Sequence, residues 1–311
     1  MSSSGAWTSN ARSGPVVVAV DGSPGAHRAI RWAVSEAVTR GVALELVHVY
    51  SLPVYGGSMM VPPLISAMDI EPAAKELLDA EIERARAGDP PVEVRGRLLQ
   101  GPVVPELVRA SAGACLLVSG TRGHGGLQRL GSTALHLAGH AHCPVVVVRG
   151  EDTAEGPELP PPGGAWSGHD RLVVAGHDGS AQSDGAARLA ADEAHRHDAR
   201  LLLVRGWVPP VLPWYEGLPG DASLLEDWDA AERRRLEQST DALSDEWPDV
   251  PIECRFVREH PVVALVAASA GADLLVVGSR GHGAFAGMLL GSVSQAAVRE
   301  AHCSVMVSHL S

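Results

Sequence analysis

Aromatic side chains and positive charge are both scarce in this sequence. Aromatic residues make up only 4% of the 311 residues, so the cores must be built mainly from alanine, valine and leucine. The formal net charge is −12, which argues against nonspecific binding to nucleic acid, because lysine and arginine are what hold a phosphate backbone. Any anion site must therefore be local and made from backbone N–H groups.

Long apolar runs and cysteine pairs are also missing. The four cysteines form no CxxC motif, and no stretch approaches the ~18 consecutive apolar residues that a membrane helix needs. The first residues have no apolar segment of the kind found in secretory signals. We therefore expect a cytoplasmic protein with reduced cysteines, no membrane segment and a disordered tail over residues 1–14.

The sequence contains an internal repeat. VVVAVDGS at residues 16–23 recurs as VVAGHDGS at 173–180, an offset of 157. TRGHG recurs at an offset of 158 and AHC at an offset of 160, in the same order along the chain. Three matches in one order at nearly constant offset indicate a duplicated domain.

A segment rich in proline and glycine separates the two copies. Residues 151–169 contain four prolines in the run from 157 to 162, followed by two glycines, so regular structure is disfavoured there. We therefore predict domain 1 over residues 15–150, a linker over 151–169 and domain 2 over 170–311.

Apolar runs and helical periodicities alternate in each copy. In the first copy we expect strands at residues 15–20, 44–50, 92–99, 115–119 and 145–148, with helices between them. The second copy repeats this order, with strands beginning near residues 172, 201, 252, 274 and 305. Such alternation predicts an α/β fold of two tandem, doubly wound, five-stranded parallel sheets, Rossmann-like, with helices on both faces.

A glycine-rich loop follows the fourth strand of each copy. In the second copy Gly278, Arg280 and Gly281 precede a nine-residue gap before Gly291 and Ser292. Glycines let the backbone approach a ligand, and the N-terminus of the helix that begins at Ser292 suits phosphate. The alternative is a plain turn that needs glycine for its backbone angles.

Asp21 and Asp178 each follow the first strand of their copy. In a doubly wound sheet the first and fourth strands can flank the crevice where ligands bind, so the aspartate and the glycine loop would face one site. The alternative is an Asp-Gly-Ser turn that only starts a helix. His195 and His197, farther along this helix, are expected at a solvated helix end.

These residues carry a resemblance to the universal stress protein family, in its tandem actinobacterial form. The features that carry it are Asp-Gly-Ser after strand one, His48-Val49 at the end of strand two and the G-x2-G-x9-G-[S/T] pattern, and together they extend over nearly all of both copies. The resemblance implies an adenine nucleotide alpha hydrolase-like fold. It also implies an ATP site with Mg2+ or Mn2+ on the phosphates.

The resemblance further implies a role for each matching position. Phosphate would be held by Gly278, Gly281, Gly291 and Ser292, and Asp178 would orient the nucleoside. The residue that lines the adenine would be Gly206 in the second copy and Val49 in the first. The remaining first-copy positions are Asp21, Gly120, Gly123, Gly131 and Ser132.

Each copy departs from the family pattern in its own way. In the first copy only seven residues separate Gly123 from Gly131, which shortens the loop by two residues. In the second copy Arg205-Gly206 replaces His-Val, and His177 precedes the aspartate. The second copy therefore has the more complete phosphate loop, and we expect it to be the stronger site.

No dedicated catalytic machinery is expected. Neither loop is followed by the Gly-Lys-Ser/Thr of a P-loop, and there is no G-x-S-x-G elbow. The first hypothesis is therefore an ATP-binding regulator of the stress response that is not an enzyme. The alternatives are a nucleotide-free scaffold of the same fold and a slow ATPase.

Self-association is expected through the last strand of each copy. These strands are short and apolar, and a strand at the edge of an open sheet invites pairing. The family resemblance points the same way. We expect the two copies to form a pseudo-dimer within the chain. The resemblance further implies a homodimer of tandem chains through other faces.

Overall fold

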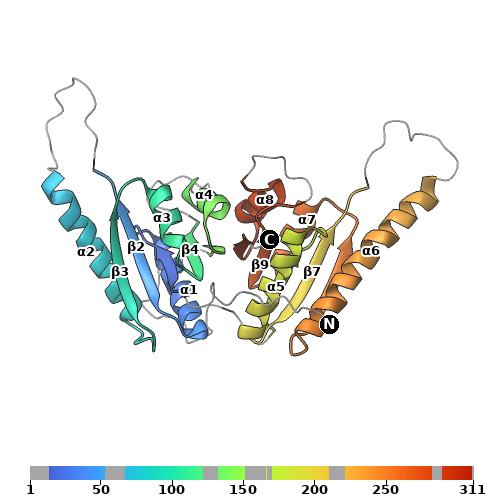
Figure 1. Cartoon of the computed structure of the whole chain (residues 1–311), viewed down its shortest axis with the longest axis horizontal. Helices are drawn as coiled ribbons and strands as arrows, with labels where there is room; N and C mark the ends of the chain where they lie inside the picture. Colours follow the sequence, from blue (N-terminus) through green and yellow to red (C-terminus); the bar gives the residue numbers. More distant parts are fainter. Residues whose placement is uncertain are drawn as a thin grey trace, which may run out of the picture. The chain divides into compact units, whose positions relative to one another are not determined.

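The computed structural model divides the chain into two compact units, Met1–Ala165 and Trp166–Ser311 (Figure 1). The structure describes residues 14–52, 67–121, 132–150, 166, 170–209, 221–281 and 289–309. Most of the predicted tail and linker lie outside these residues, as do Gly123 and Gly131. Each unit is described below by itself.

Unit 1 alternates strands and helices along the chain. Its elements are β1 (Val16–Ala19), α1 (Pro24–Arg40), β2 (Leu44–Tyr50), α2 (Ala67–Arg86), β3 (Val94–Gln100), α3 (Val103–Ser111), β4 (Leu116–Gly120), α4 (Ser132–His140) and β5 (Val145–Val148). The predicted strands are all present, shifted by at most two residues. Helix α2 contains Pro72 in its first two turns.

Unit 2 repeats this order. Its elements are β6 (Leu172–Gly176), α5 (Ala181–Arg196), β7 (Arg200–Gly206), α6 (Asp221–Glu246), β8 (Ile252–Val257), α7 (Pro261–Ser269), β9 (Leu274–Gly278), α8 (Ser292–Glu300) and β10 (Ser304–Ser308).

The strands of each unit form a parallel sheet with one reversal of order. The order is β3-β2-β1-β4-β5 in unit 1 and β10-β9-β6-β7-β8 in unit 2. Val16 pairs with both Leu44 and Leu116, so β1 lies between β2 and β4. In unit 2, β6 lies between β7 and β9 in the same way. The predicted doubly wound fold is confirmed, and the strand order reverses beside the first strand of each unit.

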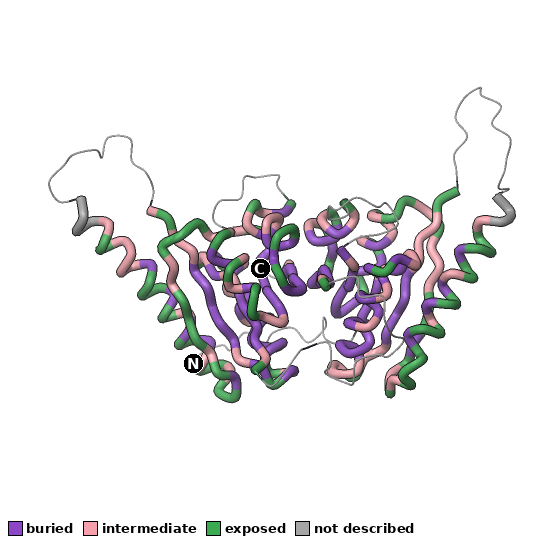
Figure 2. The backbone as a smooth tube through the Cα atoms, turned by 180° about the vertical axis from the view of Figure 1, so that it is seen from behind, coloured by how far each residue is buried: buried purple, intermediate pink, exposed green. Residues whose placement is uncertain are grey.

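The helices cover both faces of each sheet. In unit 2, α5 and α6 contact each other and one face of the sheet, while α7 and α8 contact each other on the other face. In unit 1, α1 and α2 pair in the same manner, as do α3 and α4. Buried residues follow the central strands (Figure 2), where Val16, Val17 and Val18 are fully buried. Burial on both faces explains why these strands are continuous apolar runs.

Serine caps start the first helix of each unit, as the sequence predicts. The Ser23 hydroxyl accepts a hydrogen bond from the Ala26 N–H at 3.2 Å, and the Ser180 hydroxyl accepts one from the Ser183 N–H at the same distance. Gly41 ends α1 with a φ of 64°, a conformation that glycine adopts without strain. The serine caps thus fix where the turn after β1 and the turn after β6 pass into helix.

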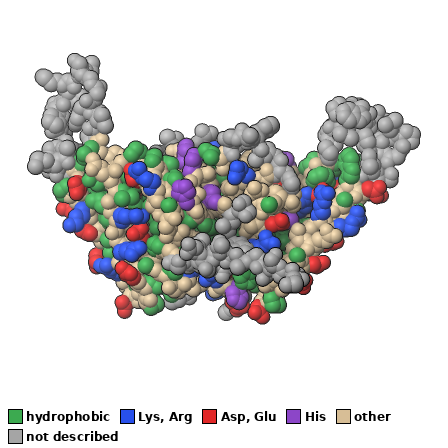
Figure 3. Space-filling view, in the orientation of Figure 1, with side chains coloured by type: hydrophobic (Ala, Val, Ile, Leu, Met, Phe, Trp, Pro, Cys, Tyr) green, Lys and Arg blue, Asp and Glu red, His purple; other side chains and the backbone are tan. Residues whose placement is uncertain are grey.

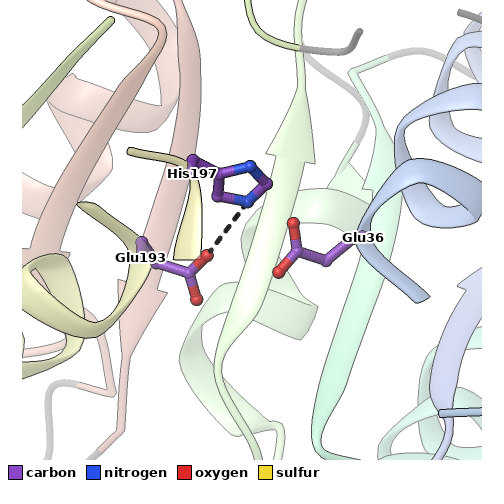
Figure 4. Close-up of side chains that lie close together, drawn as sticks. All are labelled: Glu36, Glu193 and His197. Carbon is purple, nitrogen blue, oxygen red and sulfur yellow. Dashed lines mark ion pairs between the residues drawn. The ribbon is translucent and has the colours of Figure 1, made fainter. Parts of the chain in front are cut away.

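The expectation that His197 lies at a solvated helix end is wrong. His197 is only 2% exposed, and its ring stacks on Trp166 with centroids 4.0 Å apart. Its Nε2 lies 3.8 Å from Oε2 of Glu193, one helical turn earlier (Figure 4). His195 is exposed, as expected, and its ring lies 5.6 Å from that of Trp247. His197 differs from His195 because Trp166, from the predicted linker, packs on its ring. No local pattern in α5 reveals this contact.

Acidic and basic side chains are interspersed on the surface of α6 (Figure 3). Arg235 donates to Glu232 at 2.7 Å, and the Arg233 guanidinium lies over the Phe256 ring at 4.9 Å. Arg233 and Arg235 are therefore engaged in local contacts. Among the described residues, no helix is both long and apolar enough to cross a bilayer.

Candidate functional site

The described part of unit 2 contains a cavity at the carboxyl ends of β6, β7 and β9. Its volume is about 380 Å³, which lies in the range of small-molecule sites. The residues that line it come from β6, β7, β9 and the two helices of one face, α7 and α8, with Ser183 of α5. The cavity lies where the strand order reverses, the place at which doubly wound sheets bind ligands.

All seven positions predicted for the second copy line this cavity. They are Asp178, Gly206, Gly278, Arg280, Gly281, Gly291 and Ser292. These residues belong to four separate segments of the chain, and the parallel sheet brings them together. Their role toward a ligand stays a prediction.

Asp178 stands at the centre of the aspartate turn. Its Oδ1 accepts hydrogen bonds from the Ser180 N–H at 3.0 Å and from the Ser180 hydroxyl at 2.6 Å. The side chain thus does what the turn alternative requires, and it also lines the cavity. The two interpretations are compatible, because one carboxylate has two oxygens with several lone pairs.

Gly281 packs directly against that carboxylate. A Cβ at position 281 would overlap Oδ2 of Asp178, so any larger residue must displace the aspartate. Gly278 is restricted for another reason, since its Cβ would lie 3.2 Å from the Gln182 backbone oxygen and 3.1 Å from that of Arg280. The first half of the glycine loop is therefore shaped partly by packing within the protein.

The second half of the loop leads into the N-terminus of α8. Residues 292–294 line the cavity, and Gly291 stands at the N-cap position without a capping side chain. Helix α5, by contrast, is capped by Ser180. The first N–H groups of a helix have no intrahelical partner and carry partial positive charge, so they attract anions. A Cβ on Gly291 would meet nothing in the described protein closer than 3.6 Å.

Gly206 lines the cavity at a place where a larger residue would not fit. A Cβ there would lie 2.5 Å from the Cα and 2.9 Å from the N of Pro261, at the start of α7. Arg205, its neighbour, points the other way. The Arg205 guanidinium forms a buried ion pair with Glu232 of α6, away from the cavity. Contacts with two neighbouring helices therefore explain why this copy has Arg-Gly in place of His-Val: Arg205 pairs with α6, and Gly206 leaves room for α7.

The unit 1 positions are only partly described. Asp21 accepts a hydrogen bond from the Ser23 N–H at 3.1 Å, as its counterpart does. Val49 and Ser132 occupy β2 and the first position of α4. Gly120 ends β4, where a Cβ would lie 2.5 Å from the Gly25 backbone oxygen. Gly120 is thus explained by the close approach of α1.

Sequence reasoning missed the structural role of His177. Its side chain is almost fully buried, and Nε2 lies 2.9 Å from Oδ1 of Asp184 in α5. Nδ1 is buried without a hydrogen-bond partner among the described residues. The substitution of histidine for Val20 of the first copy was the available signal. Its meaning depends on α5 and α6, which the local sequence does not show.

The chain matches the model of the universal stress protein family over residues 13–149 and again over residues 171–309. Universal stress protein Rv2623 of Mycobacterium tuberculosis is 33% identical over 301 residues, which cover 94% of this chain and 95% of that protein. The crystal structure of a universal stress protein from Archaeoglobus fulgidus DSM 4304 superimposes with a TM-score of 0.63 at 18% identity. That alignment covers 96% of this chain and 97% of that one.

A shorter solved structure matches one domain length of the chain. It is a universal stress protein from Archaeoglobus fulgidus in complex with dAMP, 31% identical, with a TM-score of 0.33. The alignment covers 43% of this chain and 97% of that one. The two family matches in tandem, together with the relative of similar length, identify this chain as a member of the universal stress protein family.

Proposed function

We propose that unit 2 binds ATP in the cavity at the ends of β6 and β9, and that nucleotide occupancy regulates what the protein contacts during a stress response. The observation that carries the proposal is the convergence of Asp178, the glycine loop and the uncapped N-terminus of α8 on one cavity. Family membership supports an adenine nucleotide as the ligand class.

The polar groups of the cavity suit a nucleotide with its phosphates at α8. The backbone N–H groups at residues 292–294 and the exposed Arg280 would hold phosphate oxygens. Asp178 would hold the nucleoside through its carboxylate. The chain's net charge of −12 offers no broad basic surface, so these local groups must supply the attraction.

A divalent cation, Mg2+ or Mn2+, would enter with the phosphates. Mg2+ binds oxygen ligands and usually takes only one or two from protein, with substrate phosphates supplying others. Among the described lining residues, Asp178 offers a carboxylate and Ser292 a hydroxyl, while the hydroxyls of Ser183 and Ser294 donate to backbone oxygens, which fits a metal carried mainly by the nucleotide. Such an ion would neutralise phosphate charge beside the N-terminus of α8.

Binding without dedicated catalysis is part of the proposal. Phosphoryl transfer requires placed cations and a group that orients the attacking water. Arg280 is the cation among the described lining residues, and His177 is turned to Asp184. Slow ATP hydrolysis is the second candidate, and Arg280 is the residue that favours it.

Unit 1 has a different role in this proposal. Its glycine loop is two residues shorter, so we propose that it serves mainly as a nucleotide-free surface. Self-association belongs to the proposal as well. Strands β5 and β10 each end the strand order of their unit, where another strand can add. A cross-linking map of the full chain would test the pairing of the last strands within the chain, with Val146→Lys expected to weaken it.

The test begins with the purified full chain. Denaturation should release adenine nucleotide, measured by absorbance and mass. Calorimetry with ATP and Mg2+ on the nucleotide-free protein should show binding that Gly281→Glu weakens at least tenfold, about 1.4 kcal/mol, because the variant places bulk and negative charge against Asp178. Unchanged ATP affinity in a folded Gly281→Glu protein would refute the assignment.

A further inference from the structure

Unit 2 contains a second cavity on the other face of its sheet. Its volume is about 320 Å³, and residues of α5 and α6 line it together with His177 and Gly179 from the turn after β6. The nucleotide cavity lies on the side of α7 and α8. Directly after β6, Asp178 lines the first cavity, while the His177 ring faces Asp184 beside the second.

In the first copy of the domain a side-chain bridge joins the two corresponding helices. There His27 of α1 and Glu81 of α2 join the two helices through a 3.0 Å contact between Nε2 and Oε1. The offsets of 157 and 158 between the copies make Asp184 the counterpart of His27 and Ser239 the counterpart of Glu81. Both replacements have shorter side chains and do not form this pair, and both line the second cavity.

A third replacement accompanies these two. Val20, which is 5% exposed in unit 1, corresponds to His177 in unit 2. Asp184 takes no part in a bridge of this kind, and its Oδ1 lies 2.9 Å from Nε2 of the His177 ring. The other ring nitrogen, Nδ1, is buried and has no partner among the described residues. Burying an unpaired polar atom costs free energy, and three linked changes thus make this side of unit 2 more polar than its counterpart in unit 1.

The charges around the recess balance. Arg188 and Arg235 contribute two positive charges, and Asp184 and Glu246 contribute two negative ones. Arg188 is paired with Glu246 at 3.1 Å across α5 and α6, and Arg235 is paired with Glu232 at 2.7 Å. Because the two positive and two negative charges of the lining cancel, neither an anion nor a cation gains a net attraction.

The remaining groups suit hydroxyls. The amide of Gln238 and the hydroxyl of Ser239 each donate and accept, and carboxylates and guanidinium groups retain further positions. Ala187 and Leu243 add an apolar wall against which C–H groups can pack. A hydroxyl group both donates and accepts, so it can hydrogen-bond to a carboxylate, an amide and a guanidinium alike.

We propose that this second cavity of unit 2 is a binding site for a small, uncharged, polyhydroxylated molecule, a monosaccharide or polyol. The site is separate from the nucleotide cavity and does not rest on the proposed function. His177 borders both cavities, so its own signals do not distinguish the two. Gly179 and Gln238 border only the second.

The test uses amide NMR on the full chain without nucleotide. Glucose, ribose and glycerol are titrated to tens of millimolar, and the Gly179 N–H and the Gln238 side-chain amide are followed. At least one of the three should produce saturable shifts at both groups. The variant Asp184→His/Ser239→Glu, which rebuilds the helix bridge of unit 1, should weaken that binding at least tenfold.

Two further variants separate a lost site from a damaged fold. Ser239→Ala keeps the cavity but removes a hydroxyl, and should weaken binding several-fold. Glu237→Gln, an exposed neighbour on the same helix outside the cavity, should leave it unchanged. The proposal is overturned if none of the three polyols saturates, if the bridged variant binds as the parent does, or if inorganic phosphate or glycine saturates these signals and the polyols do not.

Discussion

Gly281 lies against the carboxylate of Asp178, so closely that a single added methyl group would overlap Oδ2. The two residues are 103 positions apart in sequence, 281 − 178, and they meet because β6 and β9 are adjacent parallel strands. The contact joins the aspartate turn to the glycine loop. It makes the two sequence signals parts of one site.

The first prediction tests this contact with the smallest substitution. Gly281→Ala should displace the Asp178 carboxylate and lower ATP affinity about tenfold, about 1.4 kcal/mol. Gly271→Ala is the matched control, because its Cβ would meet nothing within 4 Å. Calorimetry on both proteins decides the matter. Equal affinities would mean that the aspartate position does not matter to the nucleotide.

The second prediction concerns Asp178 itself. Asp178→Ala should weaken ATP binding and also reduce stability by about 1 kcal/mol, because Ser180 loses the oxygen that accepts from both its N–H and its hydroxyl. That loss corresponds to about 2–4 °C in Tm.

Asp21→Ala in unit 1 is the control for this prediction. It removes the acceptor of the Ser23 N–H, and should cost some stability without changing ATP affinity in unit 2. If Asp178→Ala lowers Tm and leaves the affinity as it was, the aspartate is only a turn residue.

The third prediction separates packing from binding at Gly206. Gly206→Val restores the residue type of the first copy, yet its side chain would strike the backbone of Pro261. Unit 2 should lose about 1–3 kcal/mol, the usual cost of overpacking. Thermal unfolding measures this loss of stability. Val49→Gly is expected to act by a different cause, the loss of side-chain contacts. A Gly206→Val protein that is as stable as the parent would contradict the close approach of α7.

The fourth prediction uses the cysteines. Burial, with a smaller effect from Cys115, raises the pKa of the Cys143 thiol to about 12. The thiol therefore stays protonated at neutral and mildly alkaline pH, and reactivity requires the thiolate. Iodoacetamide at pH 8 should modify the exposed Cys254 and spare Cys143 until the protein unfolds. Peptide mass spectrometry after native labelling checks this, and equal labelling rates would show that Cys143 is accessible.

Much of the fold could be predicted from local patterns. The duplicated motifs revealed two domains, and apolar runs that alternate with helical periodicity required parallel sheets. Ser23 and Ser180 marked where helices begin, because a serine cap acts within three residues. Boundaries were less certain where no local rule decides, as at α2, which begins at residue 67 and continues through Pro72.

The candidate site was predictable as a set of positions. Asp178, Gly281 and Ser292 carry local signals for a turn, a close approach and a helix start, and the strand order places all three signals at one edge. The reasons for other members were not predictable. Gly120 and Gly206 are small because Gly25 and Pro261 come close to them, and those contacts join distant segments.

The sequence by itself determined the repeat, the alternation of strands and helices and the turns that carry the aspartates, since each depends on residues that are neighbours along the chain. Only the tertiary structure decided which side chains of different elements contact one another. It turned Arg205 to Glu232 and His197 to Trp166, and it left a cavity where Asp184 and Ser239 replace a helix bridge. These outcomes depend on side chains from different elements filling, or failing to fill, a shared space, and no single segment encodes that volume.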